Sequence, residues 1–560
     1  MHVETDVLII GSGGAGMYAA IEASRAGAGV FLADRSLIGR GGATVMAQMT
    51  VAVALGEATP DHWSHHYRDT LEAGRGLCDE RLARLLCEDG PDCIRQMDAW
   101  GIGWARQDGH IAQAFAPGHD RPRCVYVDFL NTGPAVSKTL RTVVTRDKSI
   151  RKAGDLLIVD LVRHDGEVAG AVALHLPSGT PVTIAAKATI VATGGLTRLY
   201  RRNSASANMG GDGYALALRA GAPLVDMEFV QFFPIGHLWP RLIGMDPIMW
   251  DPFRYKLGGR LLNREGEEFA ARYGASEDGR YVITRDVATY AIVKEVEAGR
   301  GSPHGGAYLS FQHCPEATLR EAFGPVIDRL AKNDIDLTST AVEVAPIAHY
   351  HMGGVVADER METQLPGLLV AGEAVGGANG ANRLSGNAIT EALVFGRRAG
   401  LSAAERAERI ARQTFAPQAA RPALDLIASA QERPGINTAK IIQSLQASMA
   451  DDVGPFRTGA KLQRALAAID GMAREIGERP IGGGGAFDMR TLDWFDLRNM
   501  LMVAHTVVQA ALARTESRGA HQREDFPGML PQWRVNQVAR LANGGIALTS
   551  TPVLAQAAAQ

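Results

Sequence analysis

The chain has 560 residues, and its 58 basic and 61 acidic side chains give a formal net charge of −3. This near-neutral balance argues against nucleic-acid binding, which usually requires a basic excess. The 5 cysteines contain no CxxC pair, so they fit neither a disulfide framework nor a zinc or iron–sulfur module and indicate a reducing compartment.

The amino-terminal residues, MHVETDVLII, lack the basic and long apolar regions of a secretory signal. No uncharged apolar run approaches the ~18 residues of a membrane span. Because domains usually hold about 100–200 residues, we expect two to four structural units in a cytoplasmic protein.

A strand, a glycine turn, a helix and a second strand open the chain. Residues 7–10 (VLII) form an apolar run typical of a strand buried on both faces. They lead into residues 11–16 (GSGGAG) and a predicted helix over residues 17–26, and a second apolar run, 30–33, ends at Asp34. This order is the fingerprint of a dinucleotide-binding unit, whereas an unligated glycine-rich turn is the plainer alternative.

Each part of the fingerprint has a physical role. Gly11 permits the tight turn, Gly13 leaves room for a pyrophosphate, and Gly16 lets the helix pack on the strand, so that the helix N-terminus faces the anion. We expect the carboxylate of Asp34 to accept hydrogen bonds from a ribose diol.

The later chain divides into several regions. Residues 188–192 and 367–371 are apolar runs that lead into glycines, as expected where parallel strands place ligand contacts at their carboxyl ends. The stretch between them, 236–344, is richer in Pro, Trp and His and is predicted to be an inserted unit. Helical spacing over residues 404–412 and 461–478 predicts a helical domain.

We place that helical domain at residues 401–515, interrupted by a linker at 481–485 (IGGGG). Residues 516–560 are predicted to be a largely irregular tail. We expect this tail to dock on the body of the protein through Trp533 and its apolar end.

Short motifs rich in Gly, His, Asp and Arg are spread over almost the whole chain. They are 66–70 (HYRDT), 192–195 (ATGG), 211–213 (GDG), 226–232 (DMEFVQF), 285–287 (RDV), 349–354 (HYHMGG), 372–373 (GE), 380–384 (GANRL) and 517–521 (SRGAH). Together they resemble the flavoprotein family of fumarate reductase, succinate dehydrogenase and L-aspartate oxidase. The resemblance implies an α/β fold with a Rossmann-like FAD-binding domain (1–235 and 345–400), an inserted α+β capping domain (236–344) and the C-terminal helical domain.

The resemblance also implies catalytic roles. Arg285 matches the arginine that passes a proton to the substrate carbon, and Arg383 and His349 match groups that hold a substrate carboxylate. A guanidinium suits that task because it forms two parallel charge-assisted hydrogen bonds. Since the pKa of arginine stays above about 12, proton donation needs an acid relay, and Asp251 and Arg254 match that relay if one residue is inserted.

Some of these residues have plainer alternatives. Arg285 could be a structural ion-pair partner of Asp286 or Glu295, and Asp251 with Arg254 could form a surface salt bridge. Either His349 or the neighbouring His351 could be a packed histidine.

The same resemblance assigns flavin contacts beyond the glycine unit. Glu373, Asp212, Ser385 and Asn387 match residues that fix the flavin. The full set implied comprises Gly11, Gly13, Gly14, Ala15, Gly16, Asp34, Arg35, Gly41, Gly42, Ala43, Thr44, Thr193, Gly194, Gly195, Asp212, Glu373, Ser385 and Asn387.

Several positions depart from the family pattern. Ala43 stands where fumarate reductases carry the histidine that bonds covalently to flavin, so we expect FAD to be bound non-covalently. Phe233 replaces a histidine that contacts a second carboxylate, Leu257 replaces an acid, and Asn379 replaces a common histidine. Since an apolar ring disfavours a buried charge, we expect a substrate with one carboxylate, or a similar anion, near the reacting carbon and a less polar far end. Phe233 could also simply fill core volume.

The function implied is that of an FAD-dependent oxidoreductase that exchanges hydride between flavin N5 and a carbon next to a carboxylate. Electrons would pass through a separate partner, often an iron–sulfur subunit in this family, because the chain has no cysteine set for its own cluster. The alternatives are an L-aspartate oxidase-like oxidase, a flavin subunit similar to that of adenylylsulfate reductase, and a non-catalytic scaffold that keeps FAD.

No metal site is expected. His62, His65 and His66 lie together without acidic or cysteine ligands, so we interpret them as a solvated face with one packed histidine. Cys78, Cys87 and Cys93 have no context of a reactive thiolate and are expected to be buried filler.

Overall fold

The computed structural model describes residues 1–128, 130–242, 248–250, 257–273, 285–411, 415–483 and 488–554, without the side chains of residues 285 and 286. The chain forms two compact units. The larger unit comprises residues 1–201, 205–231 and 350–560, and the smaller unit comprises residues 202–204 and 232–349.

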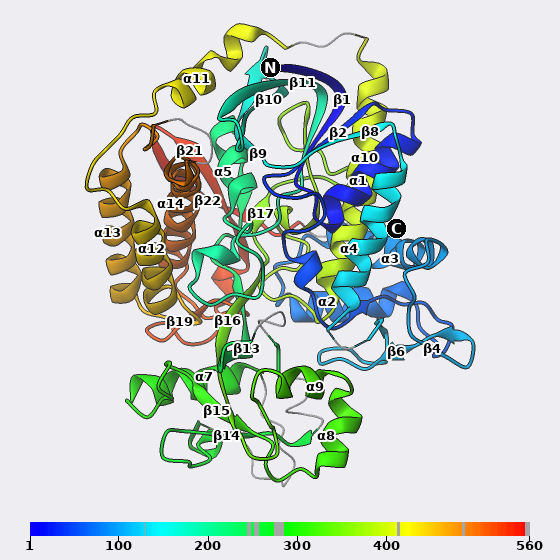
Figure 1. Ribbon diagram of the computed structural model, residues 1–560, viewed down its shortest axis with the longest axis vertical. Helices are drawn as coiled ribbons and strands as arrows, with labels where there is room; N and C mark the ends of the chain where they lie inside the picture. Colours follow the sequence, from blue (N-terminus) through cyan, green and yellow to red (C-terminus); the bar gives the residue numbers. More distant parts are fainter. Residues whose placement is uncertain are drawn as a thin grey trace. The chain divides into compact units, whose positions relative to one another are not determined.

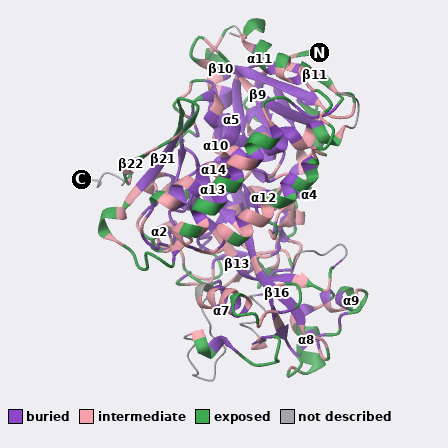
Figure 2. Ribbon diagram, turned by 90° about the vertical axis from the view of Figure 1, so that its left-hand side faces the viewer, coloured by how far each residue is buried: buried purple, intermediate pink, exposed green. Residues whose placement is uncertain are grey.

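A seven-stranded sheet forms the centre of the larger unit, with strand order β8-β2-β1-β11-β10-β9 and β18 paired with β11 (Figure 1). The strands β1, β2, β11 and β18 run parallel, so the turns that follow them meet at one edge of the sheet. The sheet is buried along most of its length (Figure 2). Its strands are β1 (His2–Ile10), β2 (Val30–Ala33), β8 (Ile150–Ala153), β9 (Leu156–His164), β10 (Glu167–His175), β11 (Thr180–Val191) and β18 (Leu368–Val370).

Helices cover this sheet. The helix α1 (Gly14–Arg25) packs on α10 (Asn387–Arg409) and on α4 (Thr132–Arg146). The helix α3 (Glu80–Ala99) packs on α10 and on α2 (Trp63–Ala73), and α5 (Asp212–Ala220) packs on β9. Because α10 runs without interruption through residue 400, the domain boundary predicted there lies inside one continuous helix.

Three helices of the carboxyl-terminal region pack together: α12 (Thr438–Asp452), α13 (Gly459–Ile476) and α14 (Met489–Ala513). The helix α14 also contacts α5, and α11 (Pro417–Ala428) lies against β9 to β11.

The tail differs from the expectation of a largely irregular segment. It contains β20 (Gln522–Arg523) and a hairpin of β21 (Val535–Ala542) and β22 (Gly545–Pro552), in a sheet of order β17-β12-β21-β22 with β12 (Leu224–Val225) and β17 (Gly354–Val355). The signal was Asn543-Gly544, where both residues have positive φ, 51° and 78°, as a two-residue hairpin turn requires. The tail does dock, and the contact is the pairing of β21 with β12; residues 555–560, at the apolar end from which docking was expected, lie outside the described residues.

The smaller unit is a mixed α+β unit built on a sheet of order β13-β16-β15-β14. A cluster of the buried rings of Trp250, Phe311 and Phe323, with centroids 5.7–6.0 Å apart, forms part of its core. Its elements are β13 (Val230–Trp239), β14 (Arg260–Leu262), α7 (Arg285–Glu297), β15 (Ala307–Ser310), α8 (Glu316–Phe323), α9 (Val326–Ala331) and β16 (Val342–His351).

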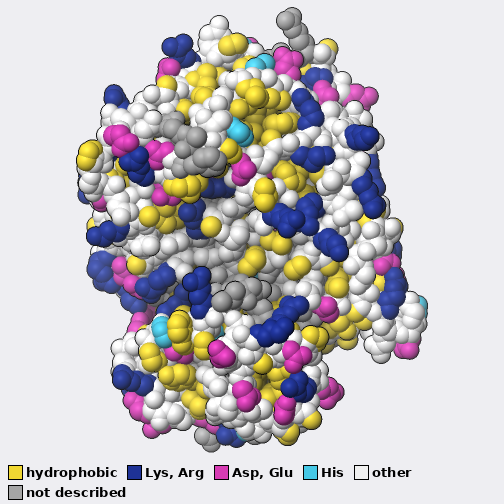
Figure 3. All heavy atoms as spheres, in the orientation of Figure 1, with side chains coloured by type: hydrophobic (Ala, Val, Ile, Leu, Met, Phe, Trp, Pro, Cys, Tyr) yellow, Lys and Arg dark blue, Asp and Glu magenta, His cyan; other side chains and the backbone are white. Residues whose placement is uncertain are grey.

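The short elements complete the chain: β3 (Val51–Ala52), β4 (Arg106–Gln107), β5 (His110–Ile111), β6 (Gln113–Ala114), β7 (Cys124–Val125), β19 (Phe456–Arg457), and the 3₁₀ turns η1 (Thr44–Met46), η2 (Thr197–Leu199), η3 (Ala270–Tyr273), η4 (Gly372–Ala374) and η5 (Pro531–Trp533). Among the residues described, none of the helices has the length and apolar character needed to cross a membrane. On the face drawn in Figure 3, basic side chains are interspersed with acidic ones.

Candidate active site

The glycine turn between β1 and α1 is packed tightly at two of its glycines and is open at the third. A Cβ added at Gly11, where φ is +101°, would lie 2.5 Å from the carbonyl oxygen of Ala192, and one at Gly16 would lie 1.9 Å from that of Gly11. At Gly13 the nearest protein atom to an added Cβ is the Oγ1 of Thr44, 3.9 Å away. Gly11 and Gly16 therefore permit close packing, whereas Gly13 borders a space that the described residues leave open.

The N-terminus of α1 faces that space with little side-chain capping. No described side chain caps this end at Gly13, and the N–H of Gly14 donates to Oγ1 of Thr44 at 3.0 Å. Backbone N–H groups and the helix dipole at such a terminus attract a phosphate group. This terminus and the open cradle at Gly13 together fit the pyrophosphate of a dinucleotide.

Asp34 has partners that the motif did not predict. One of its carboxylate oxygens accepts hydrogen bonds from the N–H and the hydroxyl of Ser12, at 2.7 and 2.6 Å. The other accepts from the N–H and hydroxyl of Ser36, at 2.8 and 2.9 Å. A carboxylate can accept about four hydrogen bonds, and these four contacts use that capacity to hold the glycine turn in place. Contact of Asp34 with a ribose therefore stays a prediction.

Arg35 and Asp212 contact each other, although 177 positions separate them in sequence: Nη1 of Arg35 donates to Oδ2 of Asp212 at 2.9 Å. Arg35 also donates to Asp496 on α14, and Asn499 of the same helix donates to Oδ1 of Asp212. This cluster ties the end of β2 to the start of α5 and to α14.

The ends of β11 and β18 come together as their parallel pairing requires. Oγ1 of Thr193 accepts a hydrogen bond from the N–H of Gly213 at 3.1 Å, and a Cβ on Gly195 would lie 2.3 Å from Oε1 of Glu373. That oxygen accepts from the N–H of His351 at 3.0 Å. Burial raises the pKa of Glu373 to about 8, so at neutral pH this side chain is mostly protonated and can donate a hydrogen bond to a polar ligand.

The loop that contains Gly41 to Thr44 reaches the same region. The N–H of Gly42 donates to the hydroxyl of Ser206 at 2.7 Å, and Thr44 accepts the hydrogen bond from Gly14. Ala43, in the middle of this loop, offers only a methyl group, which cannot form a bond to a flavin.

Ser385 and Asn387 both contact other protein groups. The carbonyl oxygen of Ser385 pairs with Nε2 of His119 at 2.7 Å, and Oδ1 of Asn387 pairs with Nε2 of the buried His66 at 2.8 Å. The amide nitrogen of Asn387 donates to Thr70 at 3.2 Å. A flavin contact from Asn387 would therefore come more readily from its backbone, and both assignments stay predictions.

Arg383 lies against an aromatic ring. Its guanidinium carbon is 4.7 Å from the ring centroid of Tyr350, a cation–π geometry, and its Nη1 donates to the carbonyl oxygen of Leu384 at 3.2 Å. Gln231 donates from Nε2 to the backbone oxygen of Arg383 at 3.0 Å and so fixes this loop. Neither Tyr350 nor Gln231 was predicted as a site residue, although both lie inside motifs of the family.

His349, in the smaller unit, is held on two sides. Its Nδ1 is 2.7 Å from the hydroxyl of Ser204, and the ring of the buried Phe233 lies 5.6 Å away at an interplanar angle of 63°. Backbone pairing positions Ser204, because its N–H donates to the carbonyl oxygen of Ala348. No local sequence signal links Ser204 to a histidine 145 positions away.

Ser204→Ala is expected to raise the KM for a carboxylate substrate about 3- to 10-fold, the value of one hydrogen bond that orients an imidazole. Ser204→Thr keeps a hydroxyl and should stay near the wild-type value, and Ser178→Ala, on an exposed turn, is the control. Steady-state kinetics on flavin-loaded enzyme measure the effect. An alanine variant with unchanged KM would contradict the role.

The side chains of three predicted catalytic residues are not among those that the structure describes. Asp251 and Arg254 lie outside the described residues, and Arg285 is the first residue of α7 but its side chain is not described. Their roles stay predictions.

Of the histidines His62, His65 and His66, which are neighbours in sequence, His66 is fully buried. Burial lowers the pKa of His66 to about 3.

The open cradle at Gly13, the helix N-terminus and the protonated acid at Glu373 fit FAD, and comparisons with known proteins agree. The family model described as "FAD binding domain" matches residues 6–389, and "Fumarate reductase flavoprotein C-term" matches residues 442–558.

Known relatives match the chain over nearly its full length. One subunit of the fumarate reductase (CoM/CoB) of Methanothermobacter marburgensis is 36% identical over 95% of this chain and 96% of its own. L-aspartate oxidase of Streptomyces coelicolor is 33% identical over 96% and 92%. The structure of Mycobacterium smegmatis Sdh1 in complex with UQ1 superposes with a TM-score of 0.89, at 35% identity, over 99% of this chain and 95% of that one.

Proposed function

Since the chain belongs to the flavoprotein family of fumarate reductase and succinate dehydrogenase and is therefore an FAD-dependent oxidoreductase, we propose that it adds or removes hydrogen next to a carboxylate on a substrate whose far end is apolar. The flavin, when bound, supplies hydride exchange at its N5. The chain itself supplies the orientation and the charge that hold the substrate.

The observation that carries this proposal is the contact between Phe233 and His349. The ring of Phe233 is 6% exposed and packs edge-on against the imidazole. Where a histidine would donate a hydrogen bond to a second carboxylate, Phe233 offers only an apolar surface, and a buried charge without a partner there is unfavourable. An aliphatic or aromatic group of a substrate would be favoured next to this ring over a charged one.

The remaining roles are those that the resemblance to the family implies. Arg383, through its guanidinium, and His349, fixed through Nδ1 by Ser204, are the two groups that we assign to carboxylate binding. Arg285 passes a proton to the carbon next to that carboxylate, with Asp251 and Arg254 as its relay. We propose that FAD is held non-covalently, because Ala43 has no group that could bond to it.

The electron partner is also a matter of proposal. An iron–sulfur subunit is our first candidate, because the chain has no set of cysteines that could hold a cluster of its own. All 5 cysteines are free thiols, and each of them except Cys314 is buried. Free thiols also support a cytoplasmic location. Direct use of oxygen, as expected of an L-aspartate oxidase-like enzyme, is the second candidate, supported by the 33% identity to the Streptomyces enzyme.

Phe233→His tests the substrate class. The wild type is expected to prefer trans-cinnamate over fumarate, and the variant should shift the ratio of kcat/KM toward fumarate about 10-fold or more, since a restored hydrogen bond to a carboxylate is worth about 1.5–3 kcal/mol. Phe233→Leu stays apolar and should keep the wild-type preference. Reduced-flavin oxidation by each acid is the measurement.

Efficient turnover of fumarate, succinate or L-aspartate by the wild type would contradict the proposed substrate class. Flavin that no carboxylate perturbs would favour a non-catalytic scaffold subunit instead.

A further inference from the structure

Behind Arg383, in the larger unit, lies a buried acid that none of the roles above uses. Glu391 is on α10 and is 1% exposed. Its Oε2 accepts hydrogen bonds from the hydroxyl of Tyr350 at 2.5 Å and from Nδ2 of Asn379 at 2.6 Å. Its Oε1 has no hydrogen-bond partner among the described residues.

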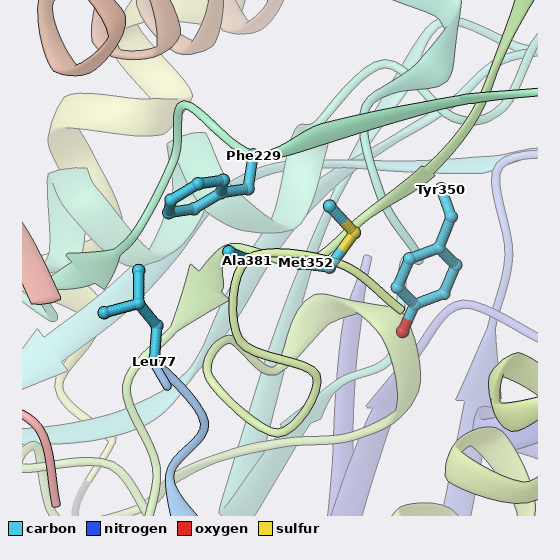
Figure 4. Packing of buried hydrophobic residues seen from close by; sticks show 5 residues of the cluster. All are labelled: Leu77, Phe229, Tyr350, Met352 and Ala381. Atoms are coloured by element: carbon cyan, nitrogen blue, oxygen red, sulfur yellow. The ribbon is translucent and has the colours of Figure 1, made fainter. Parts of the chain in front are cut away.

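Tyr350 connects this acid to Arg383. It lies at the edge of a cluster of apolar side chains with Leu77, Phe229, Met352 and Ala381 (Figure 4). The face of its ring receives the guanidinium, and its hydroxyl donates to the carboxylate. A phenol that donates to an anion becomes richer in electrons, and a richer ring attracts a cation more strongly.

Asn379 gives the acid an unusual setting. It stands where the family commonly has a histidine, whose positive form would stabilise an ionised carboxylate. The amide of Asn379 donates a hydrogen bond but brings no charge, so within the described part of the chain the only positive group that faces Glu391 closely is Arg383. Among the described residues, Tyr350, Glu373 and Tyr214 are further titratable groups that interact electrostatically with Glu391.

The carboxyl group of Glu391 changes its protonation state near neutral pH. Burial raises its pKa to about 7, against the opposing effects of Tyr350, Asn379 and Arg383. Burial also raises the pKa values of Tyr350 and Tyr214, so both phenols stay neutral over this range. Glu391 is therefore mostly neutral below about pH 7 and mostly ionised above it.

We propose that Glu391 is a positioning residue that sets, through Tyr350 and Arg383, how strongly the protein attracts a substrate carboxylate. When Glu391 is neutral, the charge of Arg383 acts fully on the substrate. When Glu391 is ionised, it holds the guanidinium through Tyr350 and offsets part of that charge. The inference rests on the proposed function of Arg383 in carboxylate binding.

The sign of the pH dependence follows. Raising the pH through about 7 adds a negative charge near Arg383, and the dissociation constant of a carboxylate ligand rises about 10-fold between about pH 5.5 and about pH 8.5. Such ligands are themselves ionised throughout this range, since the unperturbed pKa of a carboxyl group is about 4.

The experiment titrates flavin-loaded protein with trans-cinnamate and with fumarate and follows the flavin absorbance at several pH values. Glu391→Gln should lose the inflection near pH 7 and bind the ligand tightly through it, which leaves only the later change that comes from Glu373, whose pKa is about 8. Asn379→His should move the inflection about one unit lower, because a nearby positive imidazole favours the ionised acid. Glu408→Gln, an exposed acid on the same helix, is the control and keeps the wild-type curve.

The outcomes separate this inference from the proposed function. Binding of cinnamate with no pH dependence in the wild type, or an unchanged inflection in both variants, overturns the role of Glu391 and leaves the proposed substrate class standing. If neither acid perturbs the flavin at any pH, carboxylate binding by Arg383 is itself wrong, and the inference falls with it. If Glu391→Gln does not fold, the shift in Asn379→His still decides.

Discussion

Arg383→Ala is expected to lower kcat/KM by about 30- to 5,000-fold, because removing one partner of a buried, hydrogen-bonded charge pair costs about 2–5 kcal/mol. Arg383 is 8% exposed and lies on the ring of Tyr350, so little water can replace its contact with an incoming carboxylate. The expected loss appears largely in KM if the residue only binds and in kcat if it also orients the reacting carbon.

The controls for this prediction use the same chemistry. Arg383→Lys keeps the charge but loses the planar fork, so it should recover only part of the activity. Free guanidinium ion added to Arg383→Ala should restore some turnover, since it can fill the vacated volume. Arg398→Ala removes a more exposed arginine that pairs with Asp89 and should leave kcat/KM unchanged. A fully active Arg383→Ala with normal flavin content would remove Arg383 from the site.

The parts of the site that depend on backbone geometry could be predicted from the sequence. The glycines of residues 11–16 are recognisable because a tight turn, a close helix and an open cradle each exclude a side chain, and the structure reproduces all three conditions. The meeting of the ends of β1, β11 and β18 was equally accessible, since parallel strands must bring their carboxyl ends to one edge.

Side-chain partners were harder to predict because they join distant segments. Asp34 carried a known motif role, yet its oxygens are taken by Ser12 and Ser36, and no motif specifies those hydroxyls. Ser204 reaches His349 only through strand pairing near Ala348. Glu391 did leave a signal, as a lone acid within an apolar helical run, AITEALVF, where a charge is unfavourable without a partner.

The tail shows a different kind of error. Alternating residues and the Asn543-Gly544 turn predict a hairpin by ordinary rules, but a terminal segment is also a common place for irregular structure. Its order comes from pairing with β12, whose sequence lies more than 300 positions earlier, so the tertiary contact decides the outcome.

Gly13→Val and Gly16→Ala should separate the two functions of the glycine turn. At Gly13 φ is −67° and ψ is −172°, a conformation that valine adopts readily, and an added Cβ meets nothing closer than 3.9 Å. The variant is therefore expected to fold and to lose FAD altogether, since its side chain fills the space left for the pyrophosphate. Activity disappears with the cofactor.

Gly16→Ala should fail in the opposite way. Its Cβ would lie 1.9 Å from the carbonyl oxygen of Gly11, so the helix must move away from the strand, and we expect a loss of about 3 kcal/mol or more in stability, at the upper end of overpacking effects. Thermal unfolding of the apoproteins is the proper comparison, because bound FAD adds stability by mass action. Wild-type apoprotein and Gly13→Val should unfold at similar temperatures and Gly16→Ala well below them. A yellow Gly13→Val preparation with one FAD per chain would show that the cofactor does not lie against this turn, and the assignment of the cradle would then be wrong.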